Sequence, residues 1–174
     1  CQRLASPAEV IEKLKTVYVE PKYDGLRAQI HVFRNPLSSE KAPQVRVFTR
    51  SLEDVTAMFP EAIEVALRIR ANSVVLDGEA IGFDPATGTL LPFQQTITRK
   101  RKHDVAETAQ TTPIKFFVYD VLSIDGVSMI DVPLQQRKAK LRTLFDDSPQ
   151  LSQPEYIVTS DPDELQHFHE RQLS

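Results

Sequence analysis

The sequence predicts an α+β fold, with largely antiparallel β-sheets flanked by helices. Residues 26–33 alternate between apolar and polar side chains, which is the period of a half-buried strand, and residues 44–49 alternate in the same way. Residues 114–122 form an almost continuous β-prone run, as in a central strand. Helical patterns are scattered between these strands, so we expect hairpins rather than repeated strand–helix–strand units.

The first helix is predicted from its starting signals. Ser6 supplies an N-cap hydroxyl, Pro7 suits the first helical turn, and Glu9 completes a capping box. A second capping box begins at Asp161 and predicts a last helix. The other expected elements are helices at 60–70 and 133–145, strands at 73–83 and 156–159, and turns at 84–88 and 124–126.

Composition sets limits on the class of protein. The chain has 174 residues, with 41% apolar and 26% charged, which predicts a single globular domain with a buried core. The single cysteine, Cys1, favours a reducing compartment, so we expect an intracellular protein: cytoplasmic, or nuclear in a eukaryote. The net charge of −3 argues against a surface that clamps nucleic acid all round, and leaves only local basic patches such as Arg99-Lys100-Arg101-Lys102.

One segment carries an unusual set of reactive side chains. Glu20-Pro21-Lys22-Tyr23-Asp24-Gly25-Leu26-Arg27 places a lysine between two acids, five residues before an arginine. A deprotonated lysine is a nucleophile, and an arginine can bind a phosphate through two parallel hydrogen bonds. The chain has five glycines and none forms a glycine-rich phosphate loop, so a nucleotide has to be held in another way. Taken alone, the segment also fits a solvated charged turn.

Three later patterns follow this segment in a set order. They are Arg50-Ser51 after a strand, Asp77-Gly78-Glu79 within a strand, and Tyr119-Asp120 in the β-prone run. Lys-x-Asp-Gly-x-Arg followed by these patterns resembles the nucleotidyltransferase domain of ATP-dependent DNA ligases. The archaeal and replicative branch is suggested by Pro92-Phe93-Gln94 before the basic run and by Asp131-Val132-Pro133-Leu134 before Arg137. The resemblance implies an ATP-grasp-like nucleotidyltransferase fold, incomplete at its C-terminal end.

The resemblance also implies roles for individual residues. Lys22 would attack the α-phosphate of ATP and carry AMP, which would pass to the 5′-phosphate of a DNA nick before the 3′-hydroxyl seals the strand. Mg²⁺ is expected with ATP, nicked double-stranded DNA as the partner, and a monomer as the state. The implied nucleotide contacts are Glu20 near adenine, Tyr119 stacked on it, Arg27 and Arg50, and Glu79 at the ribose or the metal; the candidate DNA contacts are Arg99, Lys100, Arg101 and Lys102. The family more often has Phe at the stacking position.

The same resemblance bears on the extent of the chain. It implies that residues 1–174 are a partial adenylation domain, without the family's N-terminal DNA-binding and C-terminal OB-fold domains, and a start at Cys1 instead of Met agrees. The family's Glu-Gly and Lys-x-Lys motifs are not found, so weak or no self-adenylation is expected of this fragment. RNA ligases and mRNA capping guanylyltransferases share the Lys-x-Asp-Gly core and remain alternatives, as does a non-catalytic nucleotide- or DNA-binding module. Asp24 is expected to orient the turn, and Asp120 to be structural.

Overall fold

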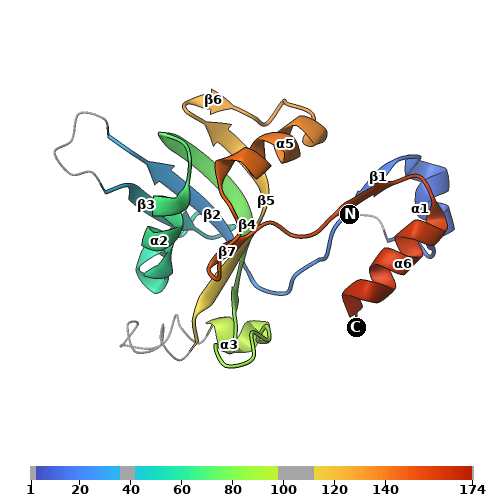
Figure 1. The fold of residues 1–174 in the computed structure, drawn as a ribbon, viewed down its shortest axis with the longest axis horizontal. Coiled ribbons are helices and arrows are strands. Elements are labelled where there is room, and N and C mark those ends of the chain that lie inside the picture. The colour runs from blue at the N-terminus through green and yellow to red at the C-terminus, as the bar shows by residue number, and fades with distance from the viewer. Residues whose placement is uncertain (1–2, 36–41, 98–111, 174) are drawn as a thin grey trace. The chain divides into compact units, whose positions relative to one another are not determined.

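The computed structural model describes residues 3–35, 42–97 and 112–173 of the chain. The chain divides into two compact units: Asp24–Gln153 is the larger, and Cys1–Tyr23 with Pro154–Ser174 is the smaller (Figure 1). Of the strand pairs in the described residues, one is parallel and the others are antiparallel. The predicted α+β class is confirmed, while the assignment of 1–174 to one partial domain stays a prediction.

The larger unit is built on a six-stranded sheet. The strand order is β3-β2-β4-β5-β6, and β7 pairs with β5 in parallel. β2 and β3 form the predicted hairpin, and β2, β4 and β5 occupy the middle of the sheet. The strands are β2 (Leu26–Phe33), β3 (Gln44–Phe48), β4 (Ser73–Gly82), β5 (Ile114–Ile124), β6 (Val127–Ser128) and β7 (Leu151–Ser152).

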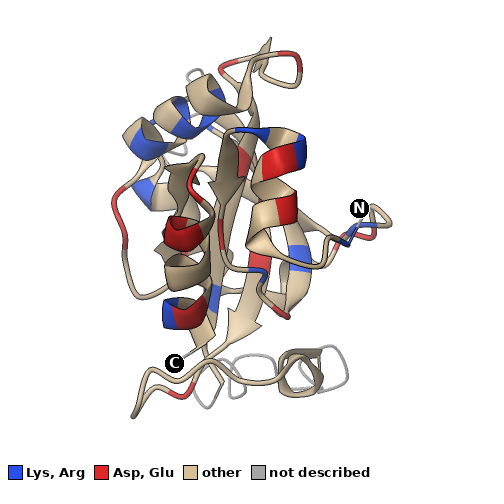
Figure 2. Cartoon of the chain, turned by 90° about the vertical axis from the view of Figure 1, so that its right-hand side faces the viewer, with Lys and Arg blue, Asp and Glu red and all other residues tan. Residues whose placement is uncertain are grey.

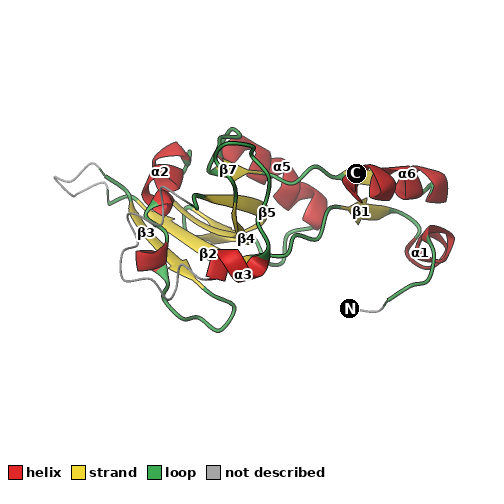
Figure 3. Cartoon of the chain, turned by 90° about the horizontal axis from the view of Figure 1, so that it is seen from below, coloured by secondary structure: helices red, strands yellow, loops and turns green. Residues whose placement is uncertain are grey.

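Helices α2 and α5 pack on the same face of this sheet (Figure 3). Ile30, Leu76 and Phe116, from the three middle strands, are fully buried in one core with apolar side chains of both helices. Successive side chains of a strand point to opposite faces, so Arg27 and Asp77 project from the other face. The helices of the larger unit are α2 (Glu61–Arg68), α3 (Phe93–Ile97), α5 (Leu134–Leu144) and the short 3₁₀ helix η1 (Thr56–Met58).

A bulge interrupts the pairing of β4 with β5. Asp77 lies opposite Asp120, whereas the next residue, Gly78, lies opposite Val118. Tyr119 is therefore an extra residue in β5 at this point. A bulge bends its strand and redirects the side chain of the extra residue, and bulges are common next to functional sites.

The core makes a direct prediction about stability. Phe116 is fully buried and packs edge-to-face on Phe59, with 5.5 Å between the ring centroids. Replacing Phe116 with Ala should lower the free energy of unfolding by about 3–5 kcal/mol, because the change leaves a cavity in a packed core. Phe33→Ala is the matched control, since the Phe33 side chain is 49% exposed on β2. Urea denaturation measures both, and an equal loss in the two variants would contradict this assignment of the core.

The smaller unit brings the two ends of the described chain together. β1 (Val17–Val19) pairs with β8 (Ile157–Thr159) as an antiparallel ribbon, and helix α1 (Pro7–Leu14) contacts helix α6 (Pro162–Leu173). The Ser6 N-cap of α1 is confirmed, because its hydroxyl accepts a hydrogen bond from the Glu9 amide at 3.2 Å, but the Glu9 carboxylate accepts from the Ala5 amide at 2.7 Å and not from that of Ser6. At the start of α6 the Asp161 carboxylate accepts from the Asp163 amide at 2.9 Å, as the predicted N-cap does, whereas the Glu164 carboxylate accepts from the Thr159 hydroxyl at 2.5 Å.

Acidic and basic side chains are interspersed over the described elements (Figure 2), in keeping with a formal net charge of only −3. No helix in the described part of the chain is long and apolar enough to cross a membrane.

Candidate functional site

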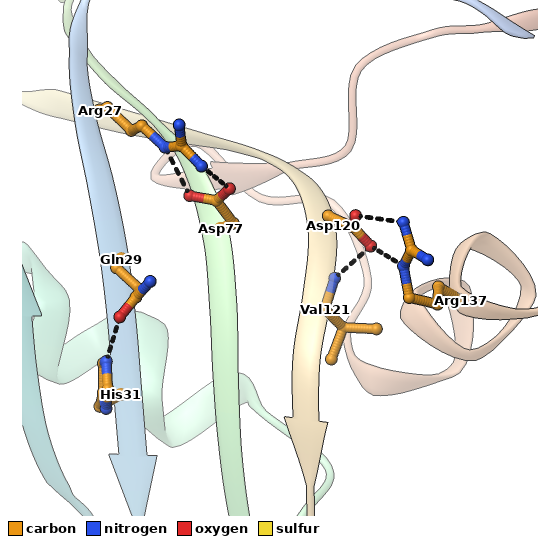
Figure 4. Close-up of polar contacts among 7 residues, drawn as sticks. All are labelled: Arg27, Gln29, His31, Asp77, Asp120, Val121 and Arg137. Carbon is orange, nitrogen blue, oxygen red and sulfur yellow. Dashed lines mark hydrogen bonds and ion pairs between the residues drawn. The ribbon is translucent and has the colours of Figure 1, made fainter. Parts of the chain in front are cut away.

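Arg27 and Asp77 form an ion pair on the sheet face opposite α2 and α5 (Figure 4). Arg27 donates from Nε to Oδ1 of Asp77 at 3.1 Å and from Nη2 to Oδ2 at 2.5 Å. The Asp77 side chain is only 7% exposed, whereas that of Arg27 is 48% exposed. The hydrogen bonds to Asp77 are the main cause of a raised Arg27 pKa, so the guanidinium stays charged and is held by one edge.

Two further predicted residues lie close to Arg27. Glu79 is directly opposite Arg27 in the pairing of β2 with β4. After Asp77, Tyr119 and then Glu79 add electrostatic contributions to the raised pKa of Arg27, so both lie within interaction range of the guanidinium. Three predicted nucleotide contacts, from three adjacent strands, therefore lie within electrostatic range of one another around Arg27.

A cavity of about 550 Å³ adjoins this group where β2 begins and β3 ends. Arg27 and Arg50 both line it, and both also line a neighbouring hollow of about 140 Å³. Two guanidinium groups at one cavity suit an anionic ligand such as a phosphate. The other residues of the larger cavity are Leu26, Thr49, Ser51, Glu53, Val55 and Ile97.

A tight turn after β3 presents Arg50 to this cavity. The Thr49 amide donates to the Glu53 carbonyl at 3.0 Å, and the Leu52 amide donates to the Thr49 carbonyl at 2.9 Å. Leu52 closes the turn with a positive φ of 61°. The Thr49 and Ser51 hydroxyls are 3.1 Å apart in the same turn and line the cavity beside Arg50.

Lys22 and Glu20 lie together in the smaller unit. Both are exposed, and both line a cavity of about 350 Å³ whose other wall is α6, with Phe168, His169 and Gln172. Tyr23, the next residue, is half-buried: burial raises its pKa, and the charges of Glu155 and Glu20 raise it further. The lysine that the sequence singles out is therefore accessible at the edge of a hollow.

The turn that follows Lys22 requires a residue without a side chain at position 25. A Cβ placed on Gly25 would lie 2.6 Å from the Ala80 carbonyl oxygen and 2.6 Å from Cγ1 of Ile81. It would also lie 2.8 Å from Cγ of Glu79. The turn that follows Lys22 and Tyr23 is thus packed directly against β4 at the residue predicted to contact the nucleotide.

The comparison with known proteins agrees with this arrangement, because residues 1–174 match the family described as "ATP dependent DNA ligase domain". The chain belongs to the ATP-dependent DNA ligase domain family. Similar proteins include the DNA ligase of Staphylothermus marinus, 37% identical over 169 residues, and the "Probable DNA ligase" of Dictyoglomus thermophilum, 38% identical over 170 residues. The matches cover 96% and 97% of this chain, but only 27% and 28% of those relatives, so the chain spans under a third of their length.

A solved structure also resembles this ligase domain. It is described as "mycobacterial DNA ligase D complexed with ATP and MES", with a TM-score of 0.60 and 25% sequence identity. The likeness covers 90% of this chain and 44% of that chain. The resemblance drawn from the motifs is thereby confirmed at the level of the family, and most of the similar proteins are archaeal, as the branch assignment expects.

Two further sequence-based assignments concern Asp120 and the basic run. Asp120 is held by Arg137 of α5, which donates to Oδ1 and Oδ2, each at 2.8 Å, so it ties β5 to a helix as expected of a structural acid. The basic run Arg99 to Lys102 lies outside the described residues. Within the described residues of the ligase domain, no group of three His, Cys, Asp or Glu side chains is arranged to hold a metal ion.

Asp77 and the hydroxyls of Thr49 and Ser51 were not among the site residues predicted from the sequence. One sequence pattern does point to Asp77. It stands two residues before Glu79 in a strand, so the two side chains share a face. The hydroxyls carried no comparable signal, because their position depends on a turn that ends a strand.

His31 makes stability depend on pH in this ligase domain. Its Nε2 lies 2.8 Å from Oε1 of Gln29, its ring packs edge-to-face on Phe48, and burial lowers its pKa below 6.5. Because the unfolded chain then binds a proton more readily, stability should fall as the pH decreases from above about 6.5 toward the folded pKa. His31→Gln should remove this part of the slope in denaturation measured at about pH 8 and about pH 5.5. The exposed His167, replaced in the same way, is the control, and equal slopes in both variants would refute the assignment.

Proposed function

We propose that this chain carries the nucleotide-activating step of a DNA ligase (ATP). The observation that carries the proposal is the grouping of four predicted nucleotide contacts in the larger unit of a chain that matches the ligase family throughout. In the first step, the deprotonated amine Nζ of Lys22 attacks the α-phosphorus of ATP; a P–N bond forms, a P–O bond breaks, pyrophosphate leaves, and the nitrogen releases one proton to solvent. An oxygen of the nick 5′-phosphate then displaces the lysine, and the 3′-hydroxyl finally displaces AMP.

We assign the binding roles from the local geometry. Arg50 stands in a tight turn at the cavity and suits the phosphates, together with Arg27. Tyr119, redirected by the bulge in β5, offers a flat ring for stacking on adenine. Glu20 shares the hollow of Lys22 and belongs to the adenine side, and Glu79 belongs to the ribose or a metal ion.

We expect Mg²⁺ to accompany ATP. Mg²⁺ is usually bound through one or two carboxylates and the substrate's phosphates, and not by a cage of protein ligands. Glu79 is a single carboxylate on the Arg27 face of the sheet, which fits that mode. When bound, the ion would neutralise charge on the departing pyrophosphate.

We propose nicked double-stranded DNA as the partner of the whole protein, which would then act as an intracellular monomer on cellular DNA. The run Arg99, Lys100, Arg101 and Lys102 is the proposed backbone contact, because four adjacent cations favour phosphates.

The test is covalent capture of the nucleotide. The full-length protein that carries these residues is incubated with labelled ATP or labelled GTP and Mg²⁺, and its intact mass and peptides are measured. The proposal expects one AMP per protein on the peptide that contains Lys22, and no GMP. A GMP adduct without an AMP adduct would point to a capping guanylyltransferase, and no adduct with either nucleotide would leave only a non-catalytic binding module.

A further inference from the structure

Two arginine–aspartate ion pairs on neighbouring strands differ in their surroundings. Asp77 on β4 lies directly opposite Asp120 on β5, and each carboxylate is gripped by one arginine through two hydrogen bonds (Figure 4). Arg137 is only 18% exposed and also donates to the Val132 carbonyl, so it works within the fold. Arg27 is 48% exposed and lines both hollows beside Arg50.

The geometry points to Asp77 as a positioning residue for nucleotide transfer: its buried carboxylate holds one edge of the Arg27 guanidinium so that the other edge faces the ligand. This inference rests on the proposed function of the chain. The pair uses Nε and Nη2 of Arg27, and no acceptor among the described residues is bonded to Nη1. Because a guanidinium is planar and rigid, fixing one edge also fixes the direction of the Nη1 hydrogens.

The Asp77 carboxylate is itself held in a fixed position. In the part of the chain that the structure describes, its carboxylate accepts hydrogen bonds from Arg27 alone, and it is anchored on the middle strand of the sheet. Arg27 belongs to the adjacent strand, so both ends of the pair are attached to a rigid sheet rather than to a loop. By contrast, Arg50 stands in a turn and has no ion pair with a described residue. The cavity therefore combines an arginine that is held by a buried carboxylate with one that makes no ion pair within the described residues.

A role of Arg27 through its charge alone and a role through its orientation predict opposite effects of replacing Asp77, so the inference can be tested. Asp77→Asn removes a negative charge beside the cavity while nearly preserving the shape of the side chain. If Arg27 acted by charge alone, the variant would bind ATP more tightly, because Arg27 would no longer be neutralised. If Asp77 positions Arg27, the variant should form the lysyl-AMP more slowly, because the guanidinium is no longer directed.

The experiment measures kcat and KM for AMP-adduct formation in the full-length protein. For Asp77→Asn we expect kcat/KM to fall about 10- to 100-fold, mainly through kcat. Arg27→Lys should show a similar loss, because lysine cannot form the two-point contact, and the double variant should be little worse than either single one. Asp120→Asn is the matched control, since it breaks the equivalent pair away from both cavities and should cost stability while keeping kcat/KM within about 3-fold.

Five results would be decisive. An Asp77→Asn enzyme with unchanged kcat/KM, or with a lower KM and unchanged kcat, would overturn the positioning role. Equal losses in Asp77→Asn and Asp120→Asn would overturn it too, since they would reflect folding in general. Losses that simply add in the double variant would show that Asp77 and Arg27 act separately. A wild-type protein that forms no adduct would instead refute the proposed function, so the two failures are told apart by the wild-type measurement.

Discussion

Replacement of Lys22 by alanine will abolish the AMP adduct of the full-length protein, with a loss of at least about 10³-fold in the rate of its formation. The reason is chemical: without an amine there is no atom to make the P–N bond, and no other step can begin. Lys22 is exposed at the edge of its cavity, so its removal should leave the free energy of unfolding nearly unchanged. Intact-mass measurement after incubation with ATP and Mg²⁺ reads the result.

One variant tests whether the amine of Lys22 or only its positive charge is needed, and a second is a control. Lys22→Arg keeps the positive charge but replaces the amine with a guanidinium that stays protonated, so it should be as inactive as the alanine variant. Lys13→Ala removes an exposed lysine from α1 in the same unit, away from the cavity, and should leave adduct formation intact. An adduct that persists in Lys22→Ala would mean that another residue is the nucleophile.

Replacement of Gly25 by alanine should give the second large effect. The added methyl group would meet a backbone oxygen of β4 at 2.6 Å and the side chain of Glu79 at 2.8 Å, so the turn or the strand must move. We expect a loss of about 1–3 kcal/mol in stability and, because Glu79 shifts, about a 100-fold lower rate of adduct formation. Denaturation and single-turnover adduct formation measure the two effects.

Gly88→Ala is the control, because it replaces a glycine that makes no close contact. It lies in an exposed turn with a positive φ of 73°, and nothing stands within 4 Å of a Cβ placed there. Gly88→Ala should therefore cost stability through backbone strain, but leave the rate of adduct formation unchanged. If Gly25→Ala slowed the reaction no more than Gly88→Ala, the close approach to Glu79 would have no role in the chemistry.

Patterns that depend on neighbouring residues were readable from the sequence. The alternation of residues 26–33 placed Ala28, Ile30 and Val32 in the core, and all three are buried. The same alternation puts Arg27 on the opposite face. The order of the motifs identified the family because each motif is short and local, and the match over the whole chain confirms it.

Features that depend on strand register could not be predicted from the sequence. The bulge at Tyr119 arises from how β4 and β5 align, and the partner of Arg27 is set by which residue of β4 comes within reach. Register is decided by the packing of the whole sheet, so no local pattern announces it. The pairing of β1 with β8 joins segments at opposite ends of the described chain, and for the same reason no local pattern indicates the smaller unit.

That distant pairing bears on the order in which the protein can be made. Asp24–Gln153 is a continuous stretch and holds all the strands of the larger sheet, so this unit can complete its core while the chain is still being synthesised. β1 is synthesised before this unit but lacks its partner strand until Ile157–Thr159 has been added. The pairing of β1 with β8 therefore forms only after the arginines of the larger unit have been synthesised.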